Sequence, residues 1–310
     1  MLDWKLNLLM KSSKRIANNL ACDQASGKYF SLALSGVLEN ADVEQAEAIK
    51  NWLHRAPPDG VPSARLLEED LAVATRDEWL ATPAKHRQTP KIDLPVVSLG
   101  ADSDWIWHPE LSAKPFSLDF LDGAIGYRMA RAESDSSPLR KALPKARDTS
   151  NKVVWDLCGG WRVDALLMAH WNFTVLSLEK SPWVHLVSAR ALDRSQLVVH
   201  KELRLQLACQ DAIEMLDSLP LTRPPLPSII YIDPMYPKIK TAALNQSEMR
   251  FLHHLSSSED IADVLLEKSL TVALDRVVIK RPIKAEDVAV PPAFTVEQGS
   301  TRYDIYLTKR

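Results

Sequence analysis

The chain has 310 residues, of which 46% are hydrophobic and 25% charged, and its formal net charge is −2. A chain of this length and composition can bury a core large enough for one large domain with an extension, or for two domains. The nearly balanced charge excludes a general electrostatic attraction to nucleic acid, so any RNA contact has to come from local basic patches.

The cysteines and the hydropathy pattern argue against two further classes of protein. Cys22, Cys158 and Cys209 form neither a CxxC pair nor a plausible disulfide framework, which indicates a reducing cytoplasm and no structural zinc. No uninterrupted apolar stretch approaches the ~18 residues that a membrane span requires, and the first residues lack a secretory signal pattern. We therefore expect a soluble, cytoplasmic protein.

Residues 1–92 predict a mostly helical N-terminal extension. Apolar residues recur at intervals of three to four, interrupted by Pro57-Pro58-Asp59-Gly60. The expected helices are 2–20, 29–38, 43–53 and 66–80. The acidic and basic residues here have no catalytic spacing and fit solvated helix faces better, although such an extension could also bind a partner.

Residues 93–132 predict a small β-rich subdomain that precedes the main domain. Its β-prone runs are 94–99, 105–108 and 116–120. The polar segment 133–150 contains Pro138 and Pro144, so we expect a linker with one short helix.

Residues 151–310 alternate strand and helix patterns with short connections, as a doubly wound, mostly parallel sheet requires. This pattern predicts a Rossmann-like α/β domain. The expected strands are 152–157, 174–178, 203–208, 228–232, 276–280 and 303–307. The expected helices are 161–170, 183–193, one that begins at Asp211, 247–255 and 259–274.

The most informative motif is Asp233-Pro234-Met235-Tyr236-Pro237, which directly follows the apolar run 228–232. Such a run indicates a buried strand, and parallel sheets place ligands at the carboxyl ends of their strands. The Asp233 carboxylate and a backbone carbonyl held by Pro234 can accept hydrogen bonds from a nucleobase amine, while Tyr236 stacks on the base. The motif therefore predicts transfer to a base nitrogen. The alternative is an Asp-Pro turn after a core strand, with Tyr236 merely packed.

Polar residues also follow the first three strands of this domain. Gly159 and Gly160 allow a ligand to approach the backbone, Glu179 can accept hydrogen bonds from both hydroxyls of a ribose, and Asp211 can accept one from an adenine amine. Taken singly, Asp156 and Asp211 are more often helix caps or loop acids. A nicotinamide cofactor would use the first two features equally well. However, a complete GxGxxG pattern is absent and the Asp233 motif has no role in hydride transfer, so S-adenosylmethionine (SAM) fits better.

From about Pro115 onward the sequence resembles the RsmJ family of small-subunit ribosomal RNA guanine-N2 methyltransferases. The matching segments follow the family's order along the chain. They are Phe116-Ser117-Leu118-Asp119-Phe120 with Gly123 and Tyr127-Arg128, the loop from Asp156 to Asp164-Ala165, Leu178-Glu179-Lys180-Ser181-Pro182, Asp233-Pro234-Met235-Tyr236-Pro237, Glu248-Met249-Arg250, Val277-Val278-Ile279-Lys280-Arg281-Pro282, and Arg302-Tyr303-Asp304-Ile305-Tyr306.

The resemblance implies a class I SAM-dependent methyltransferase that modifies the N2 amine of a guanine in 16S rRNA, either free or in a small-subunit particle. The expected cofactor-binding residues are Asp156, Gly159, Gly160, Val163, Asp164, Glu179, Lys180, Asp211, Ala212 and Asp233. The expected catalytic residues, which hold the target base, are Asp233, Pro234, Met235 and Tyr236. The expected RNA-binding residues are Arg128, Lys238, Lys240, Arg250, Lys280 and Arg281. No metal site is expected, because His253-His254 has no third ligand at a suitable spacing.

Two departures from the family pattern keep other functions open. Arg162 and Val163 stand where the family has a glycine and an arginine, and these side chains would crowd the cofactor loop. The segment 132–137 is acidic and has no glycine, whereas the family is glycine-rich after the position of Arg128. One alternative is therefore a non-catalytic protein that binds RNA or the ribosome on a methyltransferase scaffold. Another is an adenine-N6 or small-molecule methyltransferase, because an Asp-Pro-aromatic corner also serves adenine amines.

Overall fold

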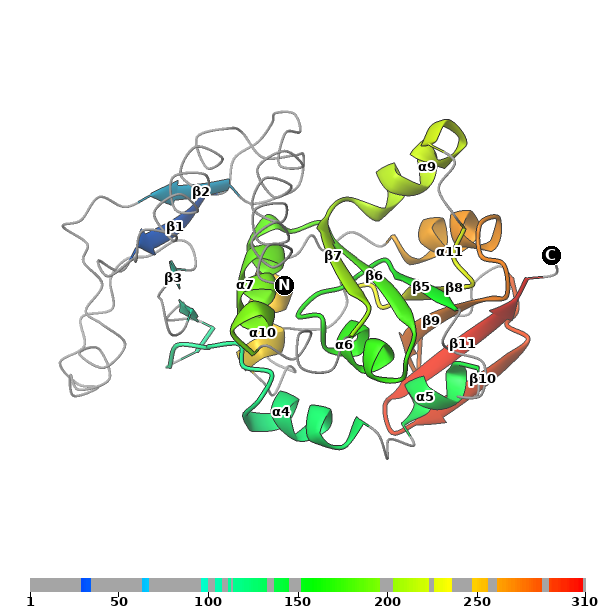
Figure 1. Cartoon of the computed structure of the whole chain (residues 1–310), viewed down its shortest axis with the longest axis horizontal. Coiled ribbons are helices and arrows are strands. Elements are labelled where there is room, and N and C mark those ends of the chain that lie inside the picture. Colours follow the sequence, from blue (N-terminus) through cyan, green and yellow to red (C-terminus); the bar gives the residue numbers. More distant parts are fainter. Residues whose placement is uncertain are drawn as a thin grey trace, which may run out of the picture. The chain divides into compact units, whose positions relative to one another are not determined.

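The computed structural model shows two compact units, which we describe separately (Figure 1). The first unit comprises 1–118 and 241–257, and the second comprises 119–240 and 258–310. The residues that the structure describes are 29–34, 63–66, 96–99, 104–107, 111–112, 114–132, 137–144, 152–195, 203–222, 226–235, 247–255, 261–285 and 290–308. The four-part division expected from the sequence remains a proposal.

The first unit contains a four-stranded sheet with the order β2-β1-β3-β4. Its strands are β1 (Tyr29–Leu34), β2 (Ser63–Leu66), β3 (Val96–Leu99) and β4 (Trp105–Trp107). β1 pairs in parallel with β2 and β3, and β3 pairs antiparallel with β4. The strands expected in 94–99 and 105–108 are confirmed.

Two helix predictions in the N-terminal extension are wrong where the structure describes them. Residues Tyr29–Leu34, expected in a helix, form β1, and Leu66 ends β2 instead of beginning a helix. In YFSLAL every second residue is Phe or Leu, which is the period of two typical of a strand. The apolar residues of this segment also fit the three-to-four spacing of a helix, so the pattern alone did not distinguish the two. The helices expected in 2–20 and 43–53 lie outside the described residues.

The prediction of a strand over 116–120 is also wrong, because this segment forms only one isolated β-bridge. Phe116 and Ile106 exchange two backbone hydrogen bonds of 2.7 Å, and the pairing stops there. The Asp119 carboxylate accepts a hydrogen bond from the backbone N–H of Leu121 at 2.7 Å, which forms a turn. The Phe116 ring stacks on Phe251 of α10 (Ser247–Leu255), with ring centroids 6.1 Å apart.

The second unit is built on a seven-stranded sheet with the order β10-β11-β9-β8-β5-β6-β7. Its strands are β5 (Val153–Asp156), β6 (Thr174–Glu179), β7 (Leu205–Cys209), β8 (Ile229–Ile232), β9 (Arg276–Pro282), β10 (Phe294–Gln298) and β11 (Thr301–Leu307). β5 to β9 are parallel, whereas β11 is antiparallel to both neighbours. The mostly parallel sheet is confirmed, and β10 is an additional strand that the sequence did not predict.

Helices cover both faces of this sheet (Figure 1). α6 (Val163–His170) and α7 (Pro182–Ser195) pack against β6 and β7, whereas α11 (Ala262–Leu270) packs against β8 and β9 and contacts α9 (Ala212–Thr222). Right-handed crossovers that run in opposite directions from the middle of the sheet place these pairs on opposite faces. This is the doubly wound arrangement expected of a class I methyltransferase fold.

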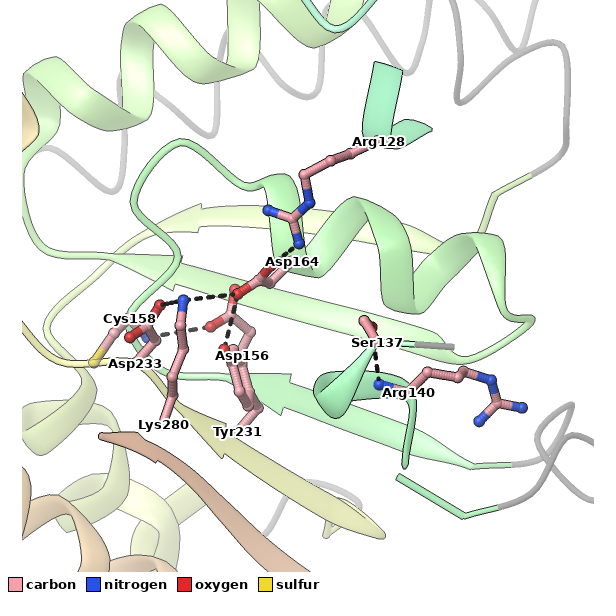
Figure 2. A network of polar contacts seen from close by, with 9 residues as sticks. All are labelled: Arg128, Ser137, Arg140, Asp156, Cys158, Asp164, Tyr231, Asp233 and Lys280. Carbon is pink, nitrogen blue, oxygen red and sulfur yellow. Dashed lines mark hydrogen bonds and ion pairs between the residues drawn. The ribbon is translucent and has the colours of Figure 1, made fainter. Parts of the chain in front are cut away.

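Two short helices precede β5 in the second unit. α4 (Gly123–Ala130) begins after Asp122, whose side chain accepts a hydrogen bond from the N–H of Gly123. The sequence did not predict α4. α5 (Pro138–Ala142) is the short helix expected within 133–150. Ser137 caps its start by accepting a hydrogen bond from the N–H of Arg140 (Figure 2). The helix packs against β10 and β11.

The core of the second unit makes β8 a rigid central strand. All four residues of Ile229–Ile232 are buried. Ile230 and Ile232 face a core that includes Leu216 of α9 and Leu265 of α11. Tyr231 alternates to the other face, where α6 lies. Burial of apolar surface stabilises the folded state by roughly 25 cal/mol per Å². β8 is therefore held firmly in the core, and it fixes the position of the residues that follow it.

Within the described ranges, none of the helices is long and apolar enough to cross a bilayer. The same part of the chain contains no cluster of three or more His, Cys, Asp or Glu side chains arranged to hold a metal ion.

Candidate active site

The candidate site lies where β5 and β8 run side by side. The chain leaves β5 toward β6 and leaves β8 toward β9, so the order of the sheet reverses between these two strands. Open α/β sheets bind ligands at such a switch point, at the carboxyl ends of the strands. Asp156 ends β5 and Asp233 directly follows β8, so both acids lie at this edge.

Five side chains from separate elements form one polar cluster here, which we call the Asp164 network (Figure 2). Lys280 of β9 places its Nζ atom 2.7 Å from Oδ2 of Asp233 and 3.5 Å from Oδ2 of Asp164. Arg128 of α4 donates from Nη2 to Oδ1 of Asp164 at 3.1 Å. The Tyr231 hydroxyl donates to Oδ2 of Asp164 at 2.8 Å. Asp164, in the first turn of α6, therefore links α4, β8 and β9.

The charges of the network stabilise one another. Burial alone would raise the pKa of Asp164, but Lys280 and Arg128 hold it below its ordinary value. Burial alone would lower the pKa of Lys280, but the carboxylates of Asp233 and Asp164 raise it. Burial and the adjacent Asp164 carboxylate raise the pKa of the Tyr231 hydroxyl well above its ordinary value. At neutral pH the network therefore contains a carboxylate at Asp164, an ammonium at Lys280 and a neutral phenol at Tyr231.

Asp233, at the carboxyl end of β8, is partly exposed. Its side chain is 31% exposed, and among the described residues its one ion-pair partner, Lys280, binds Oδ2. Burial raises the pKa of Asp233, and Lys280 counteracts part of that rise. Pro234 is buried and Met235 is half-buried, so the corner after β8 is anchored. Tyr236 lies outside the described residues.

The loop after β5 is fastened to the end of β6 through Glu179. The backbone N–H groups of Gly160 and Ser181 donate to Oε2 and Oε1 of Glu179, each at 2.8 Å, and the N–H of Gly159 donates to the carbonyl of Leu178 at 2.7 Å. Burial raises the pKa of Glu179, while Arg162 and the backbone N–H groups lower it. A carboxylate oxygen can accept more than one hydrogen bond, so this fixed group suits the paired hydroxyls of a ribose.

Asp156 is buried at this edge of the sheet, where its carboxyl group accepts hydrogen bonds from β6 and from the loop after β5. It is 2% exposed; Oδ2 accepts a hydrogen bond from the Ser177 hydroxyl at 2.6 Å, and Oδ1 accepts one from the N–H of Cys158 at 3.4 Å. Burial raises the pKa of Asp156 to about 7, against the lowering effects of Ser177 and Arg162.

Asp211 caps a helix, as single acids after strands often do. Its Oδ1 accepts hydrogen bonds from the N–H groups of Ile213 and Glu214 at 2.7 and 3.3 Å, and Lys180 pairs with its Oδ2 at 3.0 Å. Ala212 is buried at the start of α9. The structure thus brings Lys180 and Asp211 together at the ends of β6 and β7. Their contact with a cofactor remains a prediction.

Arg162 does not point outward from the loop, contrary to the crowding expected from the sequence. Its backbone is left-handed, with φ of 65°, and its side chain is fully buried. The guanidinium donates to the Ser177 hydroxyl at 2.8 Å, to Nδ1 of His185 at 3.0 Å and to the carbonyl of Ala208 at 3.3 Å. Trp161 is also buried, whereas Val163 is half-buried in the first turn of α6.

Of the residues expected to bind RNA, the structure brings two together. Lys280 and Arg128 belong to the Asp164 network, and the Arg128 side chain remains half-exposed. Arg281 is buried, with Nη1 at 4.0 Å from Oδ2 of Asp304. Arg250 lies in the first unit, which we do not position against the site. Lys238 and Lys240 lie outside the described residues, so their role remains a prediction.

Sequence reasoning missed three polar residues that shape the site. Tyr231 and Ser177 lie within strands that were treated as apolar, and His185 lies on α7. A signal was present for the first two, because each places a hydroxyl in an otherwise aliphatic run near the carboxyl end of a strand. His185 carried no comparable signal.

Comparisons with known proteins agree with this geometry. Residues 104–308 match the SAM_MT family model, which describes SAM-dependent methyltransferases. Ribosomal RNA small subunit methyltransferase J of Nitrosococcus oceani is 34% identical over 233 residues, covering 74% of this chain and 89% of that protein. The protein of the same name from Thioalkalivibrio sulfidiphilus is 33% identical over 198 residues, covering 63% and 76% respectively.

Among solved structures, the SAM-dependent methyltransferase NGO1261 from Neisseria gonorrhoeae superposes with a TM-score of 0.55. The match covers 89% of this chain and 95% of that one at 20% identity, and this likeness supports the fold alone.

Proposed function

This chain belongs to the ribosomal RNA small subunit methyltransferase J family of SAM-dependent methyltransferases, and we propose that it methylates the exocyclic N2 amine of a guanine in 16S rRNA. SAM is the cofactor. The RNA is recognised either free or within a small-subunit particle, and the reaction takes place in the cytoplasm.

The observation that carries this proposal is the position of Asp233. Its partly exposed carboxylate follows the buried strand β8 at the switch point, adjacent to the loop that is fastened to Glu179. A nucleobase amine is a hydrogen-bond donor, and a carboxylate fixed in this way is a suitable acceptor for it. The same edge therefore offers places for an adenosine and for a base.

The proposed cofactor contacts follow from the fastened loop. Glu179 accepts hydrogen bonds from the two ribose hydroxyls, and the backbone of Gly159 and Gly160 lets the ligand approach closely. Lys180 and Asp211 stand at the neighbouring strand ends, where an adenine amine can meet the Asp211 carboxylate. The proposed cofactor contacts therefore lie at the carboxyl ends of β5, β6 and β7.

The chemistry requires mainly positioning from the protein. The cofactor supplies a methyl group already activated on a sulfonium. With SAM bound, the guanine N2 nitrogen would take up this methyl group, leaving S-adenosylhomocysteine, and would lose a proton to solvent. Hydrogen bonds from the amine to Asp233 and to the carbonyl of Pro234 would orient the amine and its lone pair. Lys280 keeps Asp233 in its acceptor form, so Asp233 need not act as a strong base.

The proposal is tested with purified protein, radiolabelled SAM, and rRNA or small-subunit particles from cells that lack the enzyme. Digestion and mass spectrometry of the nucleosides should identify N2-methylguanosine, and Asp233→Ala should abolish it. Asp263→Asn, at an exposed carboxylate on α11, is the matched control. N6-methyladenosine as the product would instead establish the adenine-N6 alternative. SAM binding without a methylated nucleoside would establish the non-catalytic alternative.

A further inference from the structure

We propose that Arg162 is a positioning residue for cofactor binding. Its buried guanidinium holds the carboxyl end of β6, where Glu179 lies, and the loop after β5 in the conformation that binds the cofactor. Gly159 is required because only a glycine at that position leaves room for the guanidinium. This inference rests on the cofactor site proposed above.

The guanidinium connects the elements that form the cofactor edge. Arg162 lies on the loop before α6, and its donors reach Ser177 on β6, His185 on α7 and the carbonyl of Ala208 on β7. Ser177 in turn donates to Asp156 at the end of β5. One side chain thus links the ends of three neighbouring strands and a helix immediately beneath the loop.

The conformation of Arg162 is unfavourable by itself, which indicates a role other than stability. A left-handed backbone at a non-glycine residue costs of order 1 kcal/mol or more, and Arg162 has φ of 65°. Its Nε atom is buried without a hydrogen-bond partner. In the described part of the chain its guanidinium makes no direct ion pair, so the charge is balanced at longer range by Glu179 and Asp156. Strain of this kind concentrates at functional sites.

Gly159 completes the arrangement. A Cβ atom built on Gly159 would lie 2.1 Å from Nη1 of Arg162 and 2.5 Å from the Ser177 hydroxyl oxygen. No real contact is that short, so any larger residue at position 159 would displace the guanidinium. Gly159 and Arg162 are therefore expected to act as a coupled pair.

The charge of Arg162 also favours the carboxylate form of Glu179. Burial raises the pKa of Glu179 and Arg162 lowers it, so removal of the guanidinium should raise this pKa further. The nearby titratable groups are Asp156, Cys158, His185, Cys209 and, beyond Asp156, Asp164 and Asp233. Burial and then Arg162 lower the pKa of His185 to about 3, so its imidazole is neutral and accepts the bond.

The test is calorimetric titration with S-adenosylhomocysteine, from pH 6.5 to 9, of the wild-type protein, Arg162→Met and Arg162→Lys. Methionine keeps much of the volume and the backbone strain but removes the charge and the donors. We expect Arg162→Met to raise Kd by about tenfold or more at pH 7, and this loss should shrink as the pH rises and Glu179 ionises. Arg162→Lys should restore the pH profile in part. KM for SAM should rise more than kcat falls.

The coupling with Gly159 is tested by Gly159→Ala in both backgrounds. In the wild-type background this substitution should weaken binding about as much as Arg162→Met, and in the Arg162→Met background it should add little. Additive effects of Gly159→Ala and Arg162→Met on binding would overturn the proposal. So would a ratio of the Arg162→Met Kd to the wild-type Kd that does not change with pH, provided that the variant is correctly folded. A variant that unfolds is replaced by Arg162→Gln. If the wild-type protein binds no S-adenosylhomocysteine, the cofactor site itself is refuted and this inference with it.

Discussion

Replacement of Asp156 by asparagine should change how the stability of this protein depends on pH. The Asp156 carboxyl is 2% exposed, and burial raises its pKa to about 7. An aspartate in an unfolded chain has a pKa of about 3.9. Between these values the folded protein binds more protons than the unfolded chain, so the free energy of unfolding must fall as the pH rises toward 7. Above pH 7 this contribution is constant.

The size of the effect follows from the two pKa values. At 1.36 kcal/mol per pKa unit, ionisation of Asp156 should lower the free energy of unfolding by about 3 kcal/mol between pH 5 and pH 8. An asparagine side chain at this position cannot ionise, so Asp156→Asn should gain about that much relative to wild type over this range. Any free-energy cost of placing the asparagine amide beside the Ser177 hydroxyl is independent of pH. It therefore cancels when the change in stability between pH 5 and pH 8 is compared for the two proteins.

Urea unfolding of the cofactor-free protein, followed by tryptophan fluorescence at pH 5, 6, 7 and 8, measures this difference. Asp263→Asn, which removes an exposed carboxylate, is the control and should run parallel to wild type. Parallel curves for Asp156→Asn and wild type would refute the reasoning, because they would mean that Asp156 is fully ionised in the folded protein throughout this range.

Three further substitutions test the site. Glu179→Gln should raise the calorimetric Kd for S-adenosylhomocysteine by about 10- to 100-fold, because it loses charge-assisted hydrogen bonds; an unchanged Kd would remove Glu179 from the cofactor site. Tyr231→Phe should lower the free energy of urea unfolding by about 1–2 kcal/mol, because Asp164 loses a buried donor; a loss near zero would show that this bond contributes nothing. Lys280→Met should reduce methyl transfer at pH 6 more than at pH 8, since Asp233 then protonates more readily; a rate ratio independent of pH would contradict that role.

The parallel part of the sheet could be predicted because buried strands leave a plain signal. β5, β6, β8 and β9 appear in the sequence as short apolar runs that end on polar residues, and the alternation of strand and helix identifies the fold class. β10 is half polar and lies at an edge of the sheet, and α4 has two glycines in eight residues, so neither showed a clear period.

That the acids of the candidate site gather at one edge could also be predicted, but not their pairing with other side chains. Acids that follow successive parallel strands must lie at the same edge of a sheet, so the order of Glu179, Asp211 and Asp233 along the chain placed them together. Their functional roles stay predictions. That Lys280 turns inward to Asp233, and that Arg162 turns beneath its loop, depends on partners far apart in the sequence. Side-chain direction of this kind is set by tertiary packing.

The Asp164 network contains equal numbers of opposite charges, with Arg128 and Lys280 on one side and Asp164 and Asp233 on the other. Methyl transfer turns a sulfonium cation into a neutral thioether and releases the positive charge as a proton. A strongly anionic pocket would bind the reactant tightly and lose that attraction along the reaction path, which deepens the ground state instead of lowering the barrier. The balanced charges of the Asp164 network add nothing to this penalty, because they exert no net attraction that the loss of the sulfonium charge would remove.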